Sequence, residues 1–304
     1  NHLQGEVDCS GAKNAGLPIL ASTILLNGSS YIGNLPHLQD ITTKLELLNS
    51  MGSSINFHED GFIEVNSSNI LLPEARYELV KTMRASILVM GPLVARYGKA
   101  KISQPGGCDI GTRPIDFHLS GLEKMGAEIT SDSKYIYLKA KKLNPIDFSF
   151  PKVSVTGTEN LMMAATLIDG TTTLENCAKE PEVIELANYL NSCGAKISGA
   201  GESEIEINGV EKLEASRWDV LFDRIEAGTY LVAGAITNGH VKVNKINPNT
   251  ISIISKKLID MGVKVNVGKD YVEVDATSSD LKAQDIYTEP FPGFPTDMQA
   301  QFMT

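Results

Sequence analysis

Several features are scarce in this sequence of 304 residues, and each scarcity excludes a class of protein. No apolar run reaches the roughly 18 residues that a membrane-spanning helix needs, so we expect no membrane partner. There are only four cysteines and no CxxC pair, which argues against a zinc site and against a disulfide framework. So few cysteines favour a reduced, cytoplasmic protein. Acidic residues outnumber basic residues, and the net charge of −10 argues against nucleic acid as the main partner.

A pattern centred on glycine recurs about every 70 residues. The segments ELLNSMGSSI, HLSGLEKMGAEI, NYLNSCGAKI and KKLIDMGVKV contain Gly52, Gly126, Gly194 and Gly262, spaced by 74, 68 and 68 residues. Apolar residues stand one, four and eleven residues before each glycine and three residues after it. The positions before the glycine form one stripe of a helix, the glycine provides a left-handed C-terminal cap, and a strand follows.

One position of this pattern varies in polarity. Eight residues before the glycine, the first two repeats have Lys44 and His118, whereas the last two have Leu186 and Ile254. We refer to it as the −8 position. Because it belongs to the apolar stripe, we expect His118 to be packed or half-buried.

Each repeat also contains an earlier helix of small and apolar residues, at about 15–28, 83–98, 159–170 and 227–239. Helices with so little polar surface are buried on most sides. One repeat therefore reads as a strand, a buried helix, a strand, an amphipathic helix and a strand pair. Four repeats fit the chain and a fifth begins at FPTDMQAQFM, so we expect this sequence to be part of a longer protein.

Polar residues gather where these buried helices begin. Lys13 and Asn14 open the first helix, Arg84 the second, residues 154–158 the third, and Asp297 the incomplete fifth. Helix N-termini carry unpaired N–H groups and the positive end of the helix dipole, so they bind phosphate and carboxylate groups. Two domains with such ends facing each other would form a charged cleft for an anionic ligand.

Structural roles stay open for three of the polar residues. Thr158 and Asp297 fit helix caps as well as they fit a binding site. Arg84 equally fits a solvated surface charge. Lys13, between small residues, fits a functional role better.

Cys108 differs from the other cysteines. It follows two glycines in PGGCDIGTRP, without apolar periodicity, and Arg113 comes five residues later. A nearby cation favours the thiolate, so we predict an exposed and reactive thiol. Cys193 replaces the methionine of the repeat and is expected in the core, and Cys9 and Cys177 are expected to be buried at strands or strand ends.

Six segments together resemble the UDP-N-acetylglucosamine enolpyruvyl transferase family over the whole chain: SGAKNAGLPIL, KTMRASILVMGPLVARYG, PGGCDIGTRPIDFHLSGLEKMGA, KVSVTGTENLMMAATLIDG, DRIEAGTYLVAGAI and FPTDMQAQ. The resemblance implies an α/β fold with two inside-out α/β barrel domains, built from the repeats of about 70 residues described above. The first domain would be residues 13–221. The second would be residues 1–12 plus 222–304, and it would be truncated in this chain.

The resemblance also implies a reaction. The enolpyruvyl group of phosphoenolpyruvate would be transferred to the 3-hydroxyl of UDP-N-acetylglucosamine with release of phosphate, without a metal or organic cofactor. This is the first committed step of peptidoglycan synthesis. Lys13 and Asn14 would lie at the phosphoenolpyruvate site, and Arg84 and Arg113 would hold anionic groups there or on the nucleotide sugar. Cys108, on a mobile loop, would be the general acid, form an adduct with phosphoenolpyruvate and be alkylated by fosfomycin.

The remaining implied contacts concern the nucleotide sugar. The uridine pocket would be lined by Arg113, Pro114, Ile115, Asp116 and Phe117. The uridine and diphosphate side would be held by Lys152, Val153, Ser154 and Val155. Asp297 would contact the 3-hydroxyl of the amino sugar and take its proton.

The sequence departs from the family pattern at two places. Thr156 stands where many members have glycine, and Gly157 follows one residue later, so the backbone contact there would differ. The family chain also continues past the position equivalent to Thr304, and that part contains a further active-site arginine.

Two other functions are compatible with parts of the sequence. A shikimate-pathway enolpyruvyl transferase would share the fold and the donor, but it lacks the cysteine loop. A non-catalytic paralogue would only bind the nucleotide sugar, and the presence of Lys13, Cys108 and Asp297 argues against it. The sequence does not indicate an oligomeric state.

Overall fold

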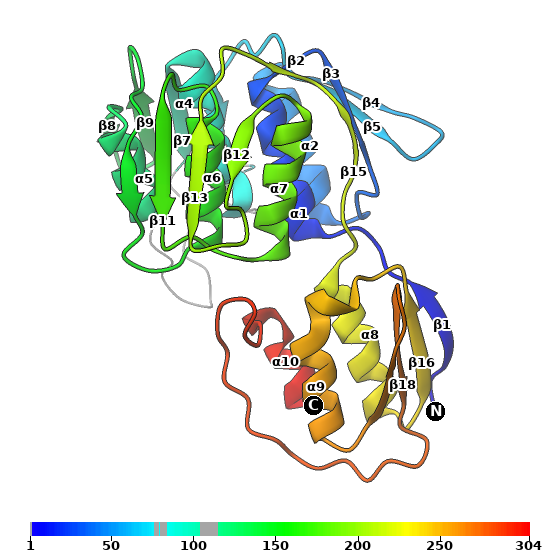
Figure 1. Ribbon diagram of the computed structural model, residues 1–304. Helices are drawn as coiled ribbons and strands as arrows, with labels where there is room; N and C mark the ends of the chain where they lie inside the picture. The colour runs from blue at the N-terminus through cyan, green and yellow to red at the C-terminus, as the bar shows by residue number, and fades with distance from the viewer. Residues whose placement is uncertain (1, 76–78, 80–83, 104–114) are drawn as a thin grey trace. The chain divides into compact units, whose positions relative to one another are not determined.

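The computed structural model describes residues 2–75, 79, 84–103 and 115–304, which divide into two compact units (Figure 1). The larger unit comprises residues 13–220, and the smaller comprises residues 1–12 together with 221–304. Cys108, Arg113 and Pro114 lie outside the described residues, and Arg84 is described through its backbone alone.

The larger unit contains three repeats with the same order of elements, as the glycine pattern predicts. The first has α1 (Lys13–Ser22), η1 (Thr23–Leu25), β2 (Leu26–Asn27), β3 (Ser29–Gly33), α2 (Gln39–Met51), β4 (Ser54–Phe57) and β5 (Ile63–Asn66). The second has β6 (Glu74–Ala75), η2 (Arg84–Val89), α4 (Met90–Tyr97), β7 (Lys99–Ser103), α5 (Asp116–Lys124), β8 (Glu128–Ser131) and β9 (Tyr135–Lys139). The third has β10 (Asp147–Ser149), α6 (Val155–Ala165), β11 (Thr171–Glu175), α7 (Pro181–Ser192), β12 (Lys196–Ser198), β13 (Glu204–Asn208), β14 (Leu213–Glu214) and β15 (Arg217–Asp219).

Each repeat builds a four-stranded sheet with one parallel edge strand. The strand orders are β15-β3-β5-β4, β6-β7-β9-β8 and β10-β11-β13-β12. The edge strand of the first sheet, β15, comes from the end of the third repeat, where Trp218 is paired with Ile32 of β3. This pairing joins the last repeat of the unit to the first, so that the three sheets together enclose the helices.

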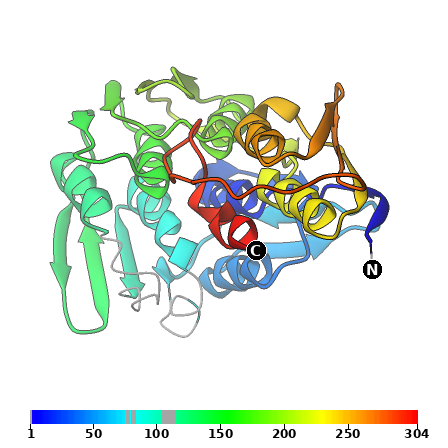
Figure 2. The ribbon, with the colours of Figure 1, turned by 90° about the horizontal axis from the view of Figure 1, so that it is seen from below.

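The central helices of the larger unit have almost no exposed surface. Every residue of α1 from Ala15 to Ser22 is buried, and so is every residue of α6 from Gly157 to Ala165. Helix α1 packs against α2 and α7, and α4 packs against α6. Figure 1 shows these helices between the outer sheets, and Figure 2 shows the same unit from below. Helices inside and sheets outside are the predicted inside-out arrangement.

The smaller unit contains the fourth repeat. Its elements are β1 (Gln4–Asp8), α8 (Arg224–Ile236), β16 (His240–Asn244), η3 (Pro248–Ile251), α9 (Ser252–Asp260), β17 (Lys264–Val267), β18 (Tyr271–Asp275), η4 (Thr296–Met298) and α10 (Gln299–Met303). Strand β1 is the parallel edge strand of the sheet β1-β16-β18-β17. The core between this sheet and its helices is apolar, and includes Leu231, Val243, Ile254, Val272 and Val274.

The predicted glycine caps are confirmed in all four repeats. Gly52, Gly126, Gly194 and Gly262 have φ values of 115°, 103°, 101° and 95°. Only glycine adopts such values without strain, so each amphipathic helix ends one or two residues before its glycine, where the chain turns into a strand. Met261, one residue before its glycine, is half-buried, whereas its counterparts in the other repeats are buried.

Candidate active site

Lys13 and Asn14 form the first turn of α1, at the N-terminal end where backbone N–H groups lack helical partners. Lys13 Nζ lies 3.0 Å from Asp40 Oδ2 in the first turn of α2. Both side chains remain about one-third exposed, at 37% and 35%, so the lysine remains accessible to a ligand. Asp40 was not singled out from the sequence, because a single acidic residue in a first helical turn is common.

Two other predicted segments begin α5 and α6. Ile115 is the N-cap of α5, and Asp116 and Phe117 follow it. Ser154 is the N-cap of α6, and its Oγ accepts a hydrogen bond from Gly157 N at 3.2 Å. Lys152 and Asp116 are exposed, and the other predicted residues here (Ile115, Phe117, Val153, Ser154 and Val155) are half-buried. All seven therefore keep surface that a ligand could contact.

His118 holds the first turns of α5 and α6 together. Gly91 N donates to Asn160 Oδ1 at 2.7 Å, which turns the Asn160 amide nitrogen toward His118 Nδ1 at 2.8 Å. The ring nitrogen Nδ1 therefore accepts, and Nε2 faces Thr156 Oγ1 at 3.3 Å. His118 is 3% exposed, in agreement with its expected packing. The structure thus brings together the segments 115–117 and 152–155.

Thr158 and Asp297, which also fit helix caps by residue type, do not occupy cap positions in the structure. Thr158 lies one turn inside α6, where its Oγ1 donates to Ser154 O and accepts from Ala178 N. It is therefore not the cap, because Ser154 occupies that position. Asp297 lies within η4, after the N-cap Pro295, so it is not the cap residue either.

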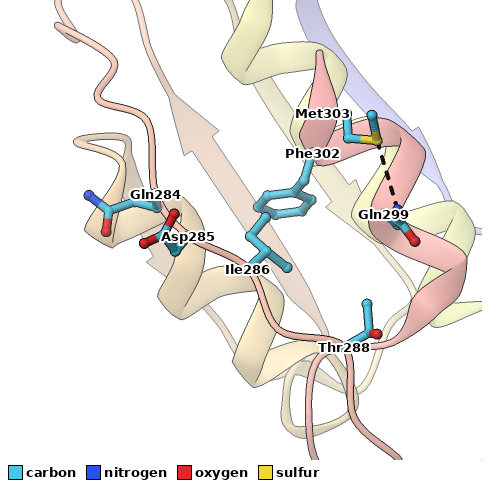
Figure 3. Close-up of a pocket in the computed structure, with 7 residues that line it drawn as sticks. All are labelled: Gln284, Asp285, Ile286, Thr288, Gln299, Phe302 and Met303. Carbon is cyan, nitrogen blue, oxygen red and sulfur yellow. Dashed lines mark hydrogen bonds between the residues drawn. The ribbon is translucent and has the colours of Figure 1, made fainter.

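Asp297 belongs to the smaller unit, in the turn that precedes α10. A groove of about 370 Å³ lies beside α10, lined by Gln284, Asp285, Ile286, Thr288, Gln299, Phe302 and Met303 (Figure 3). Asp297 does not line it, nor does any other residue predicted for the site. The groove therefore adds nothing to the candidate site.

A buried lysine, Lys44, follows Asp40 by about one turn of α2. Lys44 is 0% exposed, and its Nζ donates a hydrogen bond to Ala85 O in the first turn of η2 at 2.7 Å. Burial lowers the pKa of Lys44 to about 7, and the negative charges of Glu159 and Asp40 oppose this shift. The sequence had shown Lys44 only as a polar residue at a core position.

Glu159 is the carboxyl group whose charge most opposes the lowering of the Lys44 pKa. It lies in α6, is 2% exposed, and its Oε1 has no hydrogen-bond partner in the described part of the chain. Burial raises the pKa of Glu159 well above its usual value, Glu182 and Glu180 add to the shift, and Lys44 opposes it. Glu159 was missed in the sequence, although a glutamate in an otherwise apolar helix was a usable signal.

The three described cysteines are buried, as predicted. Cys9, Cys177 and Cys193 are 3%, 2% and 3% exposed. Burial raises the pKa of Cys9 and of Cys177 to about 12, and it also raises that of Cys193. These thiols are therefore poor nucleophiles, since the thiolate is the reactive form.

Neither a metal-binding cluster nor a membrane-spanning helix is found among the described residues. Within residues 2–75, 79, 84–103 and 115–304, no three His, Cys, Asp or Glu side chains are grouped so as to hold a metal ion. In that same part of the chain, no helix has both the length and the apolar character that a membrane crossing requires.

Comparisons with known proteins define the class. A family model described as EPSP synthase (3-phosphoshikimate 1-carboxyvinyltransferase) matches residues 1–304. The chain therefore belongs to the EPSP synthase family of enolpyruvyl transferases. It is 50% identical over 302 residues to UDP-N-acetylglucosamine 1-carboxyvinyltransferases from three strains of Coxiella burnetii, covering 99% of this chain and 70% of each relative.

Solved structures share the fold. The enolpyruvyl transferase NikO from Streptomyces tendae matches with a TM-score of 0.87 at 21% identity, over 99% of this chain and 72% of that chain. An EPSP synthase from Acinetobacter baumannii matches with a TM-score of 0.67 at 19% identity, over 90% of this chain and 65% of that chain. The predicted enolpyruvyl transferase fold is thereby confirmed.

Proposed function

We propose that this protein transfers the enolpyruvyl group of phosphoenolpyruvate to the 3-hydroxyl of UDP-N-acetylglucosamine and releases phosphate. The observation that carries the proposal is the 50% identity to enzymes named for this substrate, over 99% of the chain. The solved EPSP synthase is only 19% identical. The cysteine segment PGGCDIGTRP also favours the nucleotide sugar over shikimate 3-phosphate as the acceptor.

The larger unit would supply most of the binding groups. Lys13, placed at the N-terminus of α1 and accessible beside Asp40, would hold the phosphate of phosphoenolpyruvate together with Asn14. Arg84 and Arg113 would bind the remaining anionic groups, because guanidinium groups form paired hydrogen bonds with carboxylates and phosphates. The neighbouring segments 115–117 and 152–155, joined through His118, would bind the uridine and the diphosphate. Arg113 and Pro114 would extend the first of these segments.

The chemistry needs a proton donor and a base. Cys108 would protonate the methylene carbon of phosphoenolpyruvate, while Asp297 would take the proton of the sugar hydroxyl as its oxygen attacks the neighbouring carbon. The tetrahedral intermediate would keep its phosphate, held by Lys13 and the arginines. Loss of a proton from the new methyl group and departure of phosphate would then give the enolpyruvyl ether.

The biological setting follows from the acceptor. A product of this kind would enter peptidoglycan synthesis, and fosfomycin would inhibit the protein by alkylating Cys108. We also place the protein in the cytoplasm, since its few cysteines suit a reducing compartment.

The test uses the protein at the full length of its relatives. Phosphate release is measured with phosphoenolpyruvate and either UDP-N-acetylglucosamine or shikimate 3-phosphate. We expect phosphate release when UDP-N-acetylglucosamine is the acceptor and none when shikimate 3-phosphate is the acceptor. Release with shikimate 3-phosphate alone would overturn the choice of acceptor, and nucleotide-sugar binding without turnover would identify a non-catalytic paralogue.

The role of Cys108 is tested separately. Cys108→Asp keeps a proton donor but removes the thiol, so we expect turnover with resistance to fosfomycin. Cys108→Ala should lose turnover. The buried Cys193 provides the control, because Cys193→Ala removes a thiol that has a raised pKa and is not expected to take part. Normal turnover by Cys108→Ala would refute general acid catalysis by this residue.

A further inference from the structure

The −8 position is buried in all four repeats, yet two of its four occupants are polar. Leu186 and Ile254 fill it with apolar side chains, whereas Lys44 and His118 occupy the same place in the first two repeats. Both polar side chains reach a neighbouring central helix near its start: His118 contacts Thr156 in α6, and Lys44 contacts Ala85 in η2. The polar −8 residues therefore connect elements that the candidate site uses.

Helix α2 links two parts of the proposed phosphoenolpyruvate site. Asp40 and Lys44 are four residues apart, so they lie on the same face of α2. Asp40 pairs with Lys13 at the start of α1, and Lys44 donates to the carbonyl of Ala85, the residue after Arg84. One helix face thus contacts the first turns of both elements that carry the proposed phosphoenolpyruvate ligands.

Stability alone does not account for a lysine at this position. Taking a lysine and a glutamate out of water costs several kcal/mol per ion, and replacing a buried pair with apolar residues is often neutral or stabilising. The third and fourth repeats show that leucine or isoleucine fills the −8 position without distortion of the repeat. The lysine at the −8 position of the first repeat therefore calls for another explanation.

We propose that Lys44 is a positioning residue of the phosphoenolpyruvate site: its hydrogen bond to Ala85 O fixes the first turn of η2, and with it the backbone of Arg84. The inference rests on the proposed function, because it takes Arg84 as a ligand of the substrate. Lys44 is fully buried, so it acts through Arg84 without touching the substrate.

The test is a set of variants in the full-length protein. Lys44→Leu combined with Glu159→Leu replaces both buried ionisable groups with smaller apolar side chains, and leucine is the residue that the third repeat has at the −8 position. We expect an unchanged or higher melting temperature, and a dissociation constant for phosphoenolpyruvate, measured with UDP-N-acetylglucosamine bound, that rises about tenfold, within the range of one charge-assisted hydrogen bond. The affinity for UDP-N-acetylglucosamine alone should not change. The control Leu186→Met alters the −8 position of another repeat conservatively and should change neither affinity.

Arg84→Ala separates this inference from the proposed function. If Arg84→Ala alone leaves phosphoenolpyruvate affinity intact, the proposed role of Arg84 fails. If Arg84→Ala weakens binding but the Lys44/Glu159 replacement does not, positioning by Lys44 is wrong. If Lys44 acts through Arg84, the replacement should have little further effect in the Arg84→Ala background, because the two changes are then not additive. Additive losses would overturn the proposal.

A second variant keeps the proposal testable if the double replacement folds poorly. Lys44→Met keeps most of the length of the side chain and removes the ammonium group that donates to Ala85 O. We expect the KM for phosphoenolpyruvate to rise while kcat changes little, since the chemical groups remain in place. A fall in kcat with an unchanged KM would refute positioning at this site.

Discussion

The first and fourth repeats share one order of elements and one glycine cap, but their interiors differ. In the first, the −8 residue Lys44 donates a hydrogen bond to the carbonyl of Ala85, and the buried carboxyl group of Glu159 opposes the lowering of its pKa. In the fourth, the −8 residue Ile254 lies in a core of Leu231, Val243 and other apolar side chains. The repeat pattern therefore determines which positions are buried, whereas the neighbouring repeat decides whether a buried position can be polar.

The largest effect is expected when the polar −8 residue of the first repeat is placed in the apolar interior of the fourth. Ile254→Lys would place an ammonium in a cluster of apolar side chains that includes Leu231 and Val243. We expect the free energy of unfolding to fall by at least about 3 kcal/mol, because an uncompensated buried charge is strongly destabilising. Urea unfolding of the full-length protein measures this, and Ile254→Met serves as the control of similar volume. An unchanged midpoint would show that the fourth repeat can solvate a charge as the first does.

The next effect is a pH dependence that only the first repeat should show. The pKa of Lys44 falls from 10.5 to about 7 on folding, so between these values the unfolded chain binds the proton and the folded chain does not. Stability from Lys44 therefore rises with pH across this window. The pKa of Glu159 is raised above 4.5, so its contribution is present at low pH and is lost as the pH rises through the folded-state pKa.

The two signs together predict a minimum. The stability of the wild type relative to the variant Lys44→Leu/Glu159→Leu should be lowest near neutral pH, with slopes of at most about 1.4 kcal/mol per pH unit on either side. Unfolding free energies measured from pH 5 to 10 test this, and a flat difference would mean that the pair titrates in the folded state as it does in the unfolded chain.

Much of the fold could be predicted from the sequence, because spacing alone specifies the repeats. The glycine pattern predicted the four amphipathic helices, their caps and the strands that follow, and it placed Lys44 and His118 at core positions. Their partners could not be predicted in this way. Ala85 and Glu159 lie in other repeats, and a contact between distant segments leaves no trace in local periodicity.

Some features of the candidate site could also be predicted from local sequence, and others could not. The start of α1 at Lys13 and the buried positions of Cys9, Cys177 and Cys193 followed from local pattern. The ion pair with Asp40 did not, because an acidic residue in a first helical turn is favoured by the helix dipole in any case. The boundary of α6 was also ambiguous, since Ser154 and Thr158 are equally good caps by residue type.

The smallest expected effect distinguishes the glycine caps of two repeats with nearly the same backbone. A Cβ added at Gly194 would meet nothing within 4 Å, whereas one added at Gly52 would lie 3.1 Å from both Asn69 O and Leu71 N. Both positions have positive φ, so Gly194→Ala should cost about 1–2 kcal/mol from backbone strain alone. Gly52→Ala should cost roughly 1 kcal/mol more, since the added methyl group presses on a backbone amide that donates to Met51 O at 3.0 Å. Urea midpoints of the two variants at one pH give the difference. Equal losses would mean that the loop after β5 moves aside freely, and that the caps of the four repeats are interchangeable.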